Sequence, residues 1–172
     1  MLKMHKPNVK VKSKDDFQGE FILEPLERGF GHTLGNSIRR VLLSSIEGVG
    51  ITQIRVENTM HEFSTIGGIR EDMIEFAANL KNVVFKMESD EPVMLKLEKK
   101  SAGEVTAADF TLPAEVEVVN PECYICNLTK KGGIKAEVRI EKDKGYRTAE
   151  ENNIEGEPLG VIPLDTLFSP VK

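Results

Sequence analysis

The chain has 172 residues, of which 40% are apolar and 30% charged, an ordinary balance for a soluble globular protein of one compact domain or two small ones. Its net charge of −5 argues against a dedicated nucleic-acid binder, because duplex binding draws most of its affinity from clustered Lys and Arg on phosphates. The sequence contains neither a long apolar run nor an apolar region after the N-terminus, so we expect no membrane span, no signal peptide and a cytoplasmic location.

The first residues are strongly basic. Five lysines precede Asp15, the first acid: Lys3, Lys6, Lys10, Lys12 and Lys14. Runs of like charge usually stay in solvent, so we favour a solvated tail or an edge strand. A phosphate contact is the alternative.

A strand, a glycine-rich loop and a helix follow in that order. The alternation over 17–26 predicts the strand, and Gly29 and Gly31 lie in the loop. We expect the helix to begin at Thr33, whose hydroxyl can cap free N–H groups, and to stop near 48–50. At 100° per residue one apolar stripe results, which should be buried, and its members are Leu34, Ile38, Val41, Leu42 and Ser45.

The opposite side of this helix carries an unusual set of side chains. Two arginines and a leucine occur where a lone domain would place only solvated charge. This side consists of Thr33, Asn36, Arg40 and Ser44, with Arg39 and Leu43 beside them. A second molecule bound there would explain the pattern, so the sequence predicts that the helix is a docking element.

The rest of the chain changes from helical to strand periodicity. A strand over 51–57 precedes a helix over 69–82, whose predicted apolar stripe is Met73, Phe76, Ala77, Leu80 and Val84. Beyond it, short strands are expected over 83–88, 93–98, 115–119, 124–128 and 134–141, with turns over 89–92 and 130–133. The pattern predicts an α+β protein in which a β-rich body follows an α/β start.

A dinucleotide-binding enzyme is the main rival interpretation. Gly29, Gly31 and Gly35 follow a strand and open a helix, and the next strand ends in Glu57. The third glycine is one residue out of place, and the first strand contains Pro25 with two glutamates, unlike a central parallel strand. We therefore interpret the glycines as a tight turn with close helix packing.

Other catalytic or metal chemistry finds little support. His32 and His61 belong to no recognisable Ser, Cys or carboxylate constellation, and the aspartates lack the clustering of a polymerase metal site. Cys123 and Cys126 lack the second ligand pair of a zinc site. We expect both thiols on one face of a strand as buried small apolar groups, with a redox pair as the alternative. No cofactor or metal is predicted.

Several motifs resemble one family in the same order along nearly the whole chain. ERGFGHTLGNSIRRVLLSS, residues 27–45, is similar to the assembly motif of the bacterial RNA polymerase alpha subunit, N-terminal domain. The further matches are HEFSTIGGIREDMIEFAANLK (61–81), VTAADF (105–110), CNLT (126–129), KGY (144–146) and LFSPV (167–171). Only the first is specific alone, but together they are very specific.

The resemblance implies a dimerisation subdomain, formed here by 1–47 with 170–172, and an inserted β-rich subdomain over 48–169. Family members continue after SPV with strands and a long helix that completes the dimer interface, so we expect an incomplete dimerisation subdomain in a chain ending at Lys172. Dimerisation with a second alpha subunit is expected through Phe30, Leu34, Ile38 and Leu42.

The implied function is an assembly scaffold of DNA-directed RNA polymerase, a nucleotidyltransferase whose catalytic residues lie in other subunits. The beta and beta-prime subunits are the expected partners, with no direct DNA binding by this segment. The expected docking residues are Arg39, Arg40, Leu43, Ser44, Asn36, Thr33, Glu71 and Asp72. A free-standing polymerase-binding regulatory module of the same fold is the alternative function.

One acidic segment precedes Pro158. Its members are Glu150, Glu151, Glu155 and Glu157. A solvated loop is the default interpretation. The alternative is a contact for a basic transcription activator, because the resemblance implies that activators bind this family.

Overall fold

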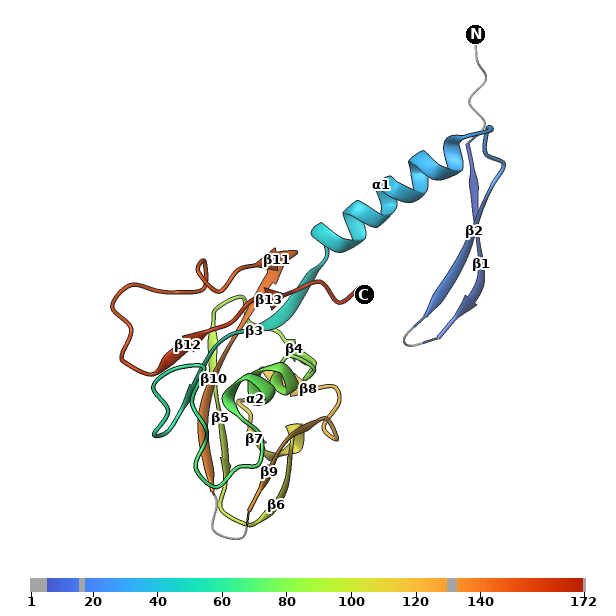
Figure 1. The fold of residues 1–172 in the computed structure, drawn as a ribbon. Coiled ribbons are helices and arrows are strands. Elements are labelled where there is room, and N and C mark those ends of the chain that lie inside the picture. The colour runs from blue at the N-terminus through green and yellow to red at the C-terminus, as the bar shows by residue number, and fades with distance from the viewer. Residues whose placement is uncertain (1–5, 16–17, 130–132, 172) are drawn as a thin grey trace. The chain divides into compact units, whose positions relative to one another are not determined.

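The computed structural model describes residues 6–15, 18–129 and 133–171, and the chain divides into two compact units, 1–41 and 42–172 (Figure 1). In chain order the elements are β1 (Asn8–Lys14), β2 (Gly19–Glu24), α1 (Phe30–Ser44), β3 (Glu47–Val56), α2 (Met73–Leu80), β4 (Phe85–Met87), β5 (Val93–Lys99), β6 (Gly103–Thr106), the 3-10 turn η1 (Ala107–Asp109), β7 (Phe110–Thr111), β8 (Val116–Val118), β9 (Tyr124–Leu128), β10 (Ile134–Lys144), β11 (Tyr146–Arg147), β12 (Val161–Pro163) and β13 (Thr166–Leu167). The predicted α+β class is confirmed.

The first unit contains an antiparallel hairpin of β1 and β2. Val11 lies opposite Phe21, and Lys10 and Lys12 form exposed ion pairs with Glu24 and Glu20. The strand interpretation of the basic N-terminal run is therefore confirmed for 8–14. The strand predicted over 17–26 is shorter, at 19–24, and its first residue lies outside the described part.

Helix α1 begins three residues earlier than predicted. Gly29 adopts a φ of +88°, and the N–H of Phe30 donates to the carbonyl of Glu27 at 3.1 Å, so a turn already leads into the helix before Thr33. The predicted cap at Thr33 is wrong because this residue lies inside the helix. Its carbonyl accepts a hydrogen bond from the Ser37 hydroxyl at 2.8 Å.

The second unit is organised around a five-stranded sheet in the order β12-β3-β10-β5-β7. All its pairings are antiparallel, and Val138 in the central β10 lies opposite Ile54 of β3 and Leu95 of β5. The described strands thus form no parallel βαβ unit, which agrees with the rejection of a dinucleotide fold. Strand β10 runs to Lys144, beyond the predicted end at 141, because β3 continues beside it to Glu47.

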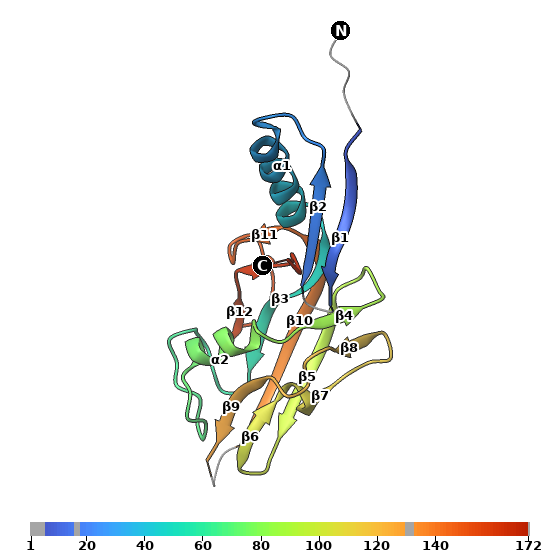
Figure 2. The ribbon, with the colours of Figure 1, turned by 90° about the vertical axis from the view of Figure 1, so that its right-hand side faces the viewer.

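Helix α2 packs against β9 beside the sheet (Figure 2). It is shorter than the predicted 69–82 because the side chain of Asp72 caps it, accepting a hydrogen bond from the Glu75 N–H at 2.8 Å. Met73, Phe76 and Leu80 are buried, as their spacing predicted. Val84 follows the helix and is exposed, so its place in the stripe is wrong.

The remaining predicted strands occur close to their expected positions. Strand β9 matches 124–128, while β4 and β8 are shorter than predicted and pair with each other. Residues 89–92 connect β4 to β5 with bends at Asp90 and Glu91, whereas 130–132 lie outside the described residues. The sequence reasoning missed the short strands β6, β7, β11, β12 and β13.

One apolar core lies inside the second unit. Its fully buried large side chains come from the sheet, α2 and β9, and include Ile54, Phe76, Leu80, Leu95, Leu97, Ile125, Val138 and Ile140. The β-rich body can therefore hold its shape through its own packing.

Candidate docking surfaces

Helix α1 exposes its apolar stripe. None of its fifteen residues is buried, and Leu34 is half-buried. The stripe residues Ile38, Val41 and Leu42, together with Phe30 one turn before Leu34, remain between 36% and 56% exposed. The expectation that this stripe is buried is therefore wrong for the chain by itself. The periodicity was identified correctly, but a period does not tell whether the covering surface belongs to the same chain.

The other side of α1 carries the predicted docking residues. Thr33, Asn36, Arg39 and Arg40 are exposed, and Leu43 is 38% exposed close to Ser44 near the end of the helix. Arg40 lies about 160° around the helix from Ile38, so one helix presents an apolar side and a guanidinium side in different directions. Such a helix can contact two molecules at once.

Glu71 and Asp72 lie in the segment that leads into α2. Asp72 is the α2 cap, and Glu71 accepts hydrogen bonds from the Tyr124 hydroxyl and from the Asn127 N–H, the latter at 2.8 Å. Burial acts to raise the pKa of Glu71, but these hydrogen bonds outweigh it and lower the pKa. Burial, followed by the bond to Glu71, raises the pKa of Tyr124 to about 12. Both acids thus have intrachain roles, and their docking role stays a prediction.

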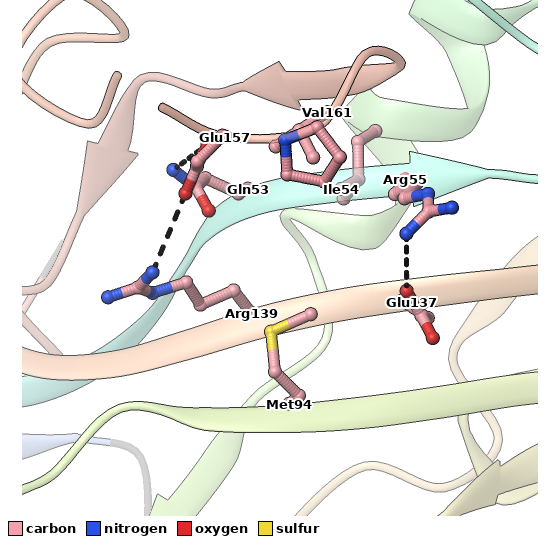
Figure 3. A pocket seen from close by; sticks show the side chains of 9 residues that line it. Gln53, Ile54, Arg55, Met94, Glu137, Arg139, Glu157 and Val161 are labelled. Carbon is pink, nitrogen blue, oxygen red and sulfur yellow. Dashed lines mark hydrogen bonds and ion pairs between the residues drawn. The ribbon is translucent and has the colours of Figure 1, made fainter. Parts of the chain in front are cut away.

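The acidic segment is partly built into the fold. Glu157 pairs with Arg139 at 3.6 Å and accepts a hydrogen bond from Gln53 at 2.9 Å (Figure 3). Glu151 caps a turn by accepting the N–H of Thr148 at 2.8 Å. The other two acids, Glu150 and Glu155, are exposed. A contact with a regulator through these four residues stays a prediction.

A cleft that the sequence reasoning missed lies where β3 begins. It has a volume of about 440 Å³, and its walls come from β3, β4 and the segment after β13. Apolar side chains of Val49, Phe85 and Phe168 line it together with Lys81 and Lys86. Lys81 and Lys86 flank the apolar residues 83–85, and ordinary surface strands have similar sequences, so the local sequence does not predict the cleft.

The two cysteines lie in different environments, which corrects the expectation that both thiols share one buried face. Cys123 precedes β9 and is half-buried, whereas Cys126 is buried within the strand. A spacing of three residues points the side chains to opposite sides when the strand period is two. Burial, with Glu71 and Asp109 nearby, raises the pKa of Cys126 to about 12, and burial also raises that of Cys123.

We therefore expect selective labelling by a thiol reagent at pH 8. Cys123 should react slowly, because its raised pKa leaves less thiolate, and Cys126 should react only after unfolding, because it combines the higher pKa with complete burial. Mass spectrometry of tryptic peptides with and without urea measures both rates. Equal labelling of the two thiols in the folded protein would contradict this assignment.

Among residues 6–15, 18–129 and 133–171, no three His, Cys, Asp or Glu side chains are grouped so that they could hold a metal ion. In the same described part of the chain, every helix is too short or too polar to cross a bilayer.

Sequence comparisons extend over the whole chain. The "RNA polymerase Rpb3/RpoA insert domain" family matches residues 52–169. Proteins named DNA-directed RNA polymerase subunit alpha are similar: that of Rubrobacter xylanophilus is 45% identical over 172 residues, covering 100% of this chain and 55% of the relative. The Moorella thermoacetica protein is 45% identical over 99% of the chain and 55% of the relative, and the Nocardioides protein 47% over 99% and 51%. The chain spans about half the length of these curated relatives.

Proposed function

The chain belongs to the family of RNA polymerase alpha subunits that carry the Rpb3/RpoA insert domain, and from this premise we propose that it is an assembly scaffold of bacterial DNA-directed RNA polymerase. It pairs with a second alpha subunit and docks the beta and beta-prime subunits, one on each copy. The chain contributes binding surfaces to the polymerase but no catalytic residue for nucleotidyl transfer. This segment does not contact DNA.

The exposure of α1 is the observation that carries the proposal. An amphipathic helix normally gains its stability by burying its apolar side, because fifteen residues are close to the lower limit for an isolated helix in water. The exposed stripe includes the residues assigned to dimerisation: Phe30, Leu34, Ile38 and Leu42. A second copy of the helix can cover this stripe, and the opposite side then remains available for a large subunit.

Two glycines inside α1 support close contact with a partner. Each costs a helix about 1 kcal/mol relative to alanine. A Cβ at Gly31 or Gly35 would have no neighbouring atom within 4 Å, so packing within the described chain does not explain their selection. The close approach of a partner's backbone to Gly31 and Gly35 would explain why glycine occurs at both positions.

The proposed subdomain boundaries follow the same scheme. We assign 1–47 with 170–172 to dimerisation and 48–169 to the insert, which overlaps the 52–169 match to the insert-domain family. The two compact units instead divide after Val41, so the last three residues of α1 fall in the unit that contains the insert.

A free-standing regulatory module is the less favoured alternative. Similarity to proteins named as polymerase alpha subunits extends over 99–100% of the chain and is not confined to one binding motif, which favours the scaffold. A module would bind one polymerase subunit without becoming part of the enzyme.

Stepwise mixing of purified components tests the proposal. The intact subunit should form a dimer, then a complex with beta, and then a complex with beta-prime, each resolved by native mass spectrometry. A control variant, Ile38→Glu in the apolar stripe, should fail to form the dimer. Binding of one large subunit by a monomer, without further assembly, would favour the regulatory module.

A further inference from the structure

Two of the sequence motifs, KGY over 144–146 and LFSPV over 167–171, come together in the fold. Strand β11, which contains the tyrosine of the first motif, pairs with β13, which contains the leucine of the second, and β13 also contacts β3 (Figure 1). Directly after β13, the N–H of Phe168 donates to the carbonyl of Gly145 at 2.9 Å. The two motifs thus form one joined segment of the second unit.

This joined segment contacts the last turn of α1. A Cβ built on Gly145 would lie 3.8 Å from the carbonyl oxygen of Ser44. The hydroxyl of Ser169, a residue that is only 4% exposed, lies 3.2 Å from the carbonyl oxygen of Leu42. All four residues belong to the second unit, which begins at Leu42. The end of α1 is therefore part of this unit.

The last turn of α1 has a carbonyl that needs a partner from outside the helix. The last four carbonyls of an α-helix lack partners within it, and Leu42 contributes one of them. The usual local solutions are a glycine directly after the helix or a basic side chain in its last turn. The last turn of α1 has no basic residue, and residues 45–47 are Ser, Ile and Glu. The local sequence thus supplies neither solution.

The Ser169 hydroxyl is placed to supply the missing donor. Its oxygen accepts a hydrogen bond from the N–H of Val171 at 3.3 Å, which leaves its proton for a carbonyl. The carbonyl of Leu42 lies at 3.2 Å and that of Val171 at 3.3 Å. The geometry favours donation to Leu42, which is the nearer acceptor and the one that the helix leaves without a partner.

Arg147 fixes the segment that carries Ser169. Its guanidinium lies over the ring of Phe168, 5.0 Å from the centroid, and pairs with Glu141 and, at 3.5 Å, with Asp143. A planar guanidinium can stack on a ring while it pairs with two carboxylates, which a lysine ammonium cannot match. Phe168 is 2% exposed and directly precedes Ser169. By holding Phe168, Arg147 therefore also fixes the position of Ser169.

We propose that Ser169 caps the C-terminal end of α1 and that Arg147 is the positioning residue that holds Ser169 in place. The capped turn carries Leu42, which is assigned to dimerisation, and Leu43, which is assigned to docking. Because none of the fifteen residues of α1 is buried, packing does little to hold this turn, and a turn that is already fixed loses less entropy on binding. Only this benefit to binding rests on the proposed assembly function.

Hydrogen exchange tests the cap on the intact subunit in the absence of beta and beta-prime. Ser169→Ala should speed exchange at least ~5-fold for the amides of residues 43–46, whose acceptors lie in the last turns of α1, and should leave the centre of β10 unchanged. Ser37→Ala is the matched control, because the Ser37 hydroxyl donates to the Thr33 carbonyl within the same helix. Unchanged exchange in Ser169→Ala, or equal acceleration by Ser37→Ala, would overturn the proposal.

A second set of variants tests the positioning role of Arg147. Arg147→Lys should speed exchange over 43–46, and combining it with Ser169→Ala should add nothing to the larger single effect, because both changes remove one hydrogen bond. Arg55→Lys is the control, since Arg55 pairs with Glu137 at 3.5 Å on the sheet, and it should leave 43–46 unchanged (Figure 3). Additive effects, or faster exchange throughout β10, would overturn the positioning role.

Titration against purified beta tests whether the capped turn serves docking. Ser169→Ala should weaken capture at least ~3-fold, whereas Ser37→Ala should leave it unchanged. If Ser169→Ala bound beta like the original protein while Arg40→Ala bound weakly, the contribution of the cap to docking would be overturned. Failure of the assembly function itself would look different: Arg40→Ala would also bind like the original protein, and the exchange effect of Ser169→Ala would remain.

Discussion

Replacing Arg40 by alanine should cut capture of the beta subunit at least ~30-fold, while leaving the fold of the chain intact. Arg40 is exposed on α1, about 160° from Ile38, so it cannot join the apolar stripe. An arginine desolvated at an interface commonly loses ~2 kcal/mol or more on truncation, partly because its acceptors are left unpaired. A titration of the intact subunit against purified beta measures the loss.

Arg39→Ala is the matched control on the same helix. It removes the same charge, but position 39 is closer to the apolar stripe, where its aliphatic stem can cover neighbouring side chains, so the loss should be smaller. Circular dichroism and thermal unfolding of both variants should match the original protein. The docking role of Arg40 would be contradicted if Arg40→Ala bound beta as tightly as the original protein. It would also be contradicted if the variant bound weakly only because it unfolds.

Replacing Gly48 by alanine should destabilise the second unit by about 2–4 kcal/mol. A Cβ at this position would lie 1.9 Å from the carbonyl oxygen of Phe168. That oxygen belongs to backbone held by a 2.9 Å hydrogen bond from the Phe168 N–H to the Gly145 carbonyl, so it cannot move away easily. The clash separates the start of β3 from the segment after β13.

Gly67→Ala provides the control for this prediction. A Cβ at Gly67 meets nothing within 4 Å, and the change should stay within about 0.5 kcal/mol. Urea unfolding followed by circular dichroism compares the two variants, since the chain has no tryptophan. Equal stability of Gly48→Ala and the original protein would show that β3 and Phe168 are not in close contact.

Local pattern predicted much of the β-rich body. Strand β9 was predicted at its observed ends, and the buried Met73, Phe76 and Leu80 of α2 followed from helical spacing. The ends of α2 were harder to predict, because the apolar pattern continues beyond both ends of the helix, whereas the Asp72 cap fixes where the helix begins. Strands of two or three residues such as β11 and β13 leave no periodic signal and depend on pairing between distant segments.

The candidate site shows a different limit. The spacing of α1 separated its apolar stripe from its arginine side, but burial could not be inferred, because it depends on which molecule covers the stripe. The exposed Met60, Phe63 and Leu159 were missed for a related reason: single apolar residues in loops are common, and the pairing of β12 with β3 that brings these loops close joins segments far apart in the sequence.

Hydroxyl-radical footprinting of α1 tests the central claim most directly. In the free subunit monomer, Phe30 and Leu42 should be oxidised readily, as their exposure requires. In the dimer bound to beta and beta-prime, both should be strongly protected, whereas the exposed Met94 on β5 should react as before. Unchanged oxidation of Phe30 and Leu42 in the assembled complex would contradict the proposal that this helix forms the assembly interface.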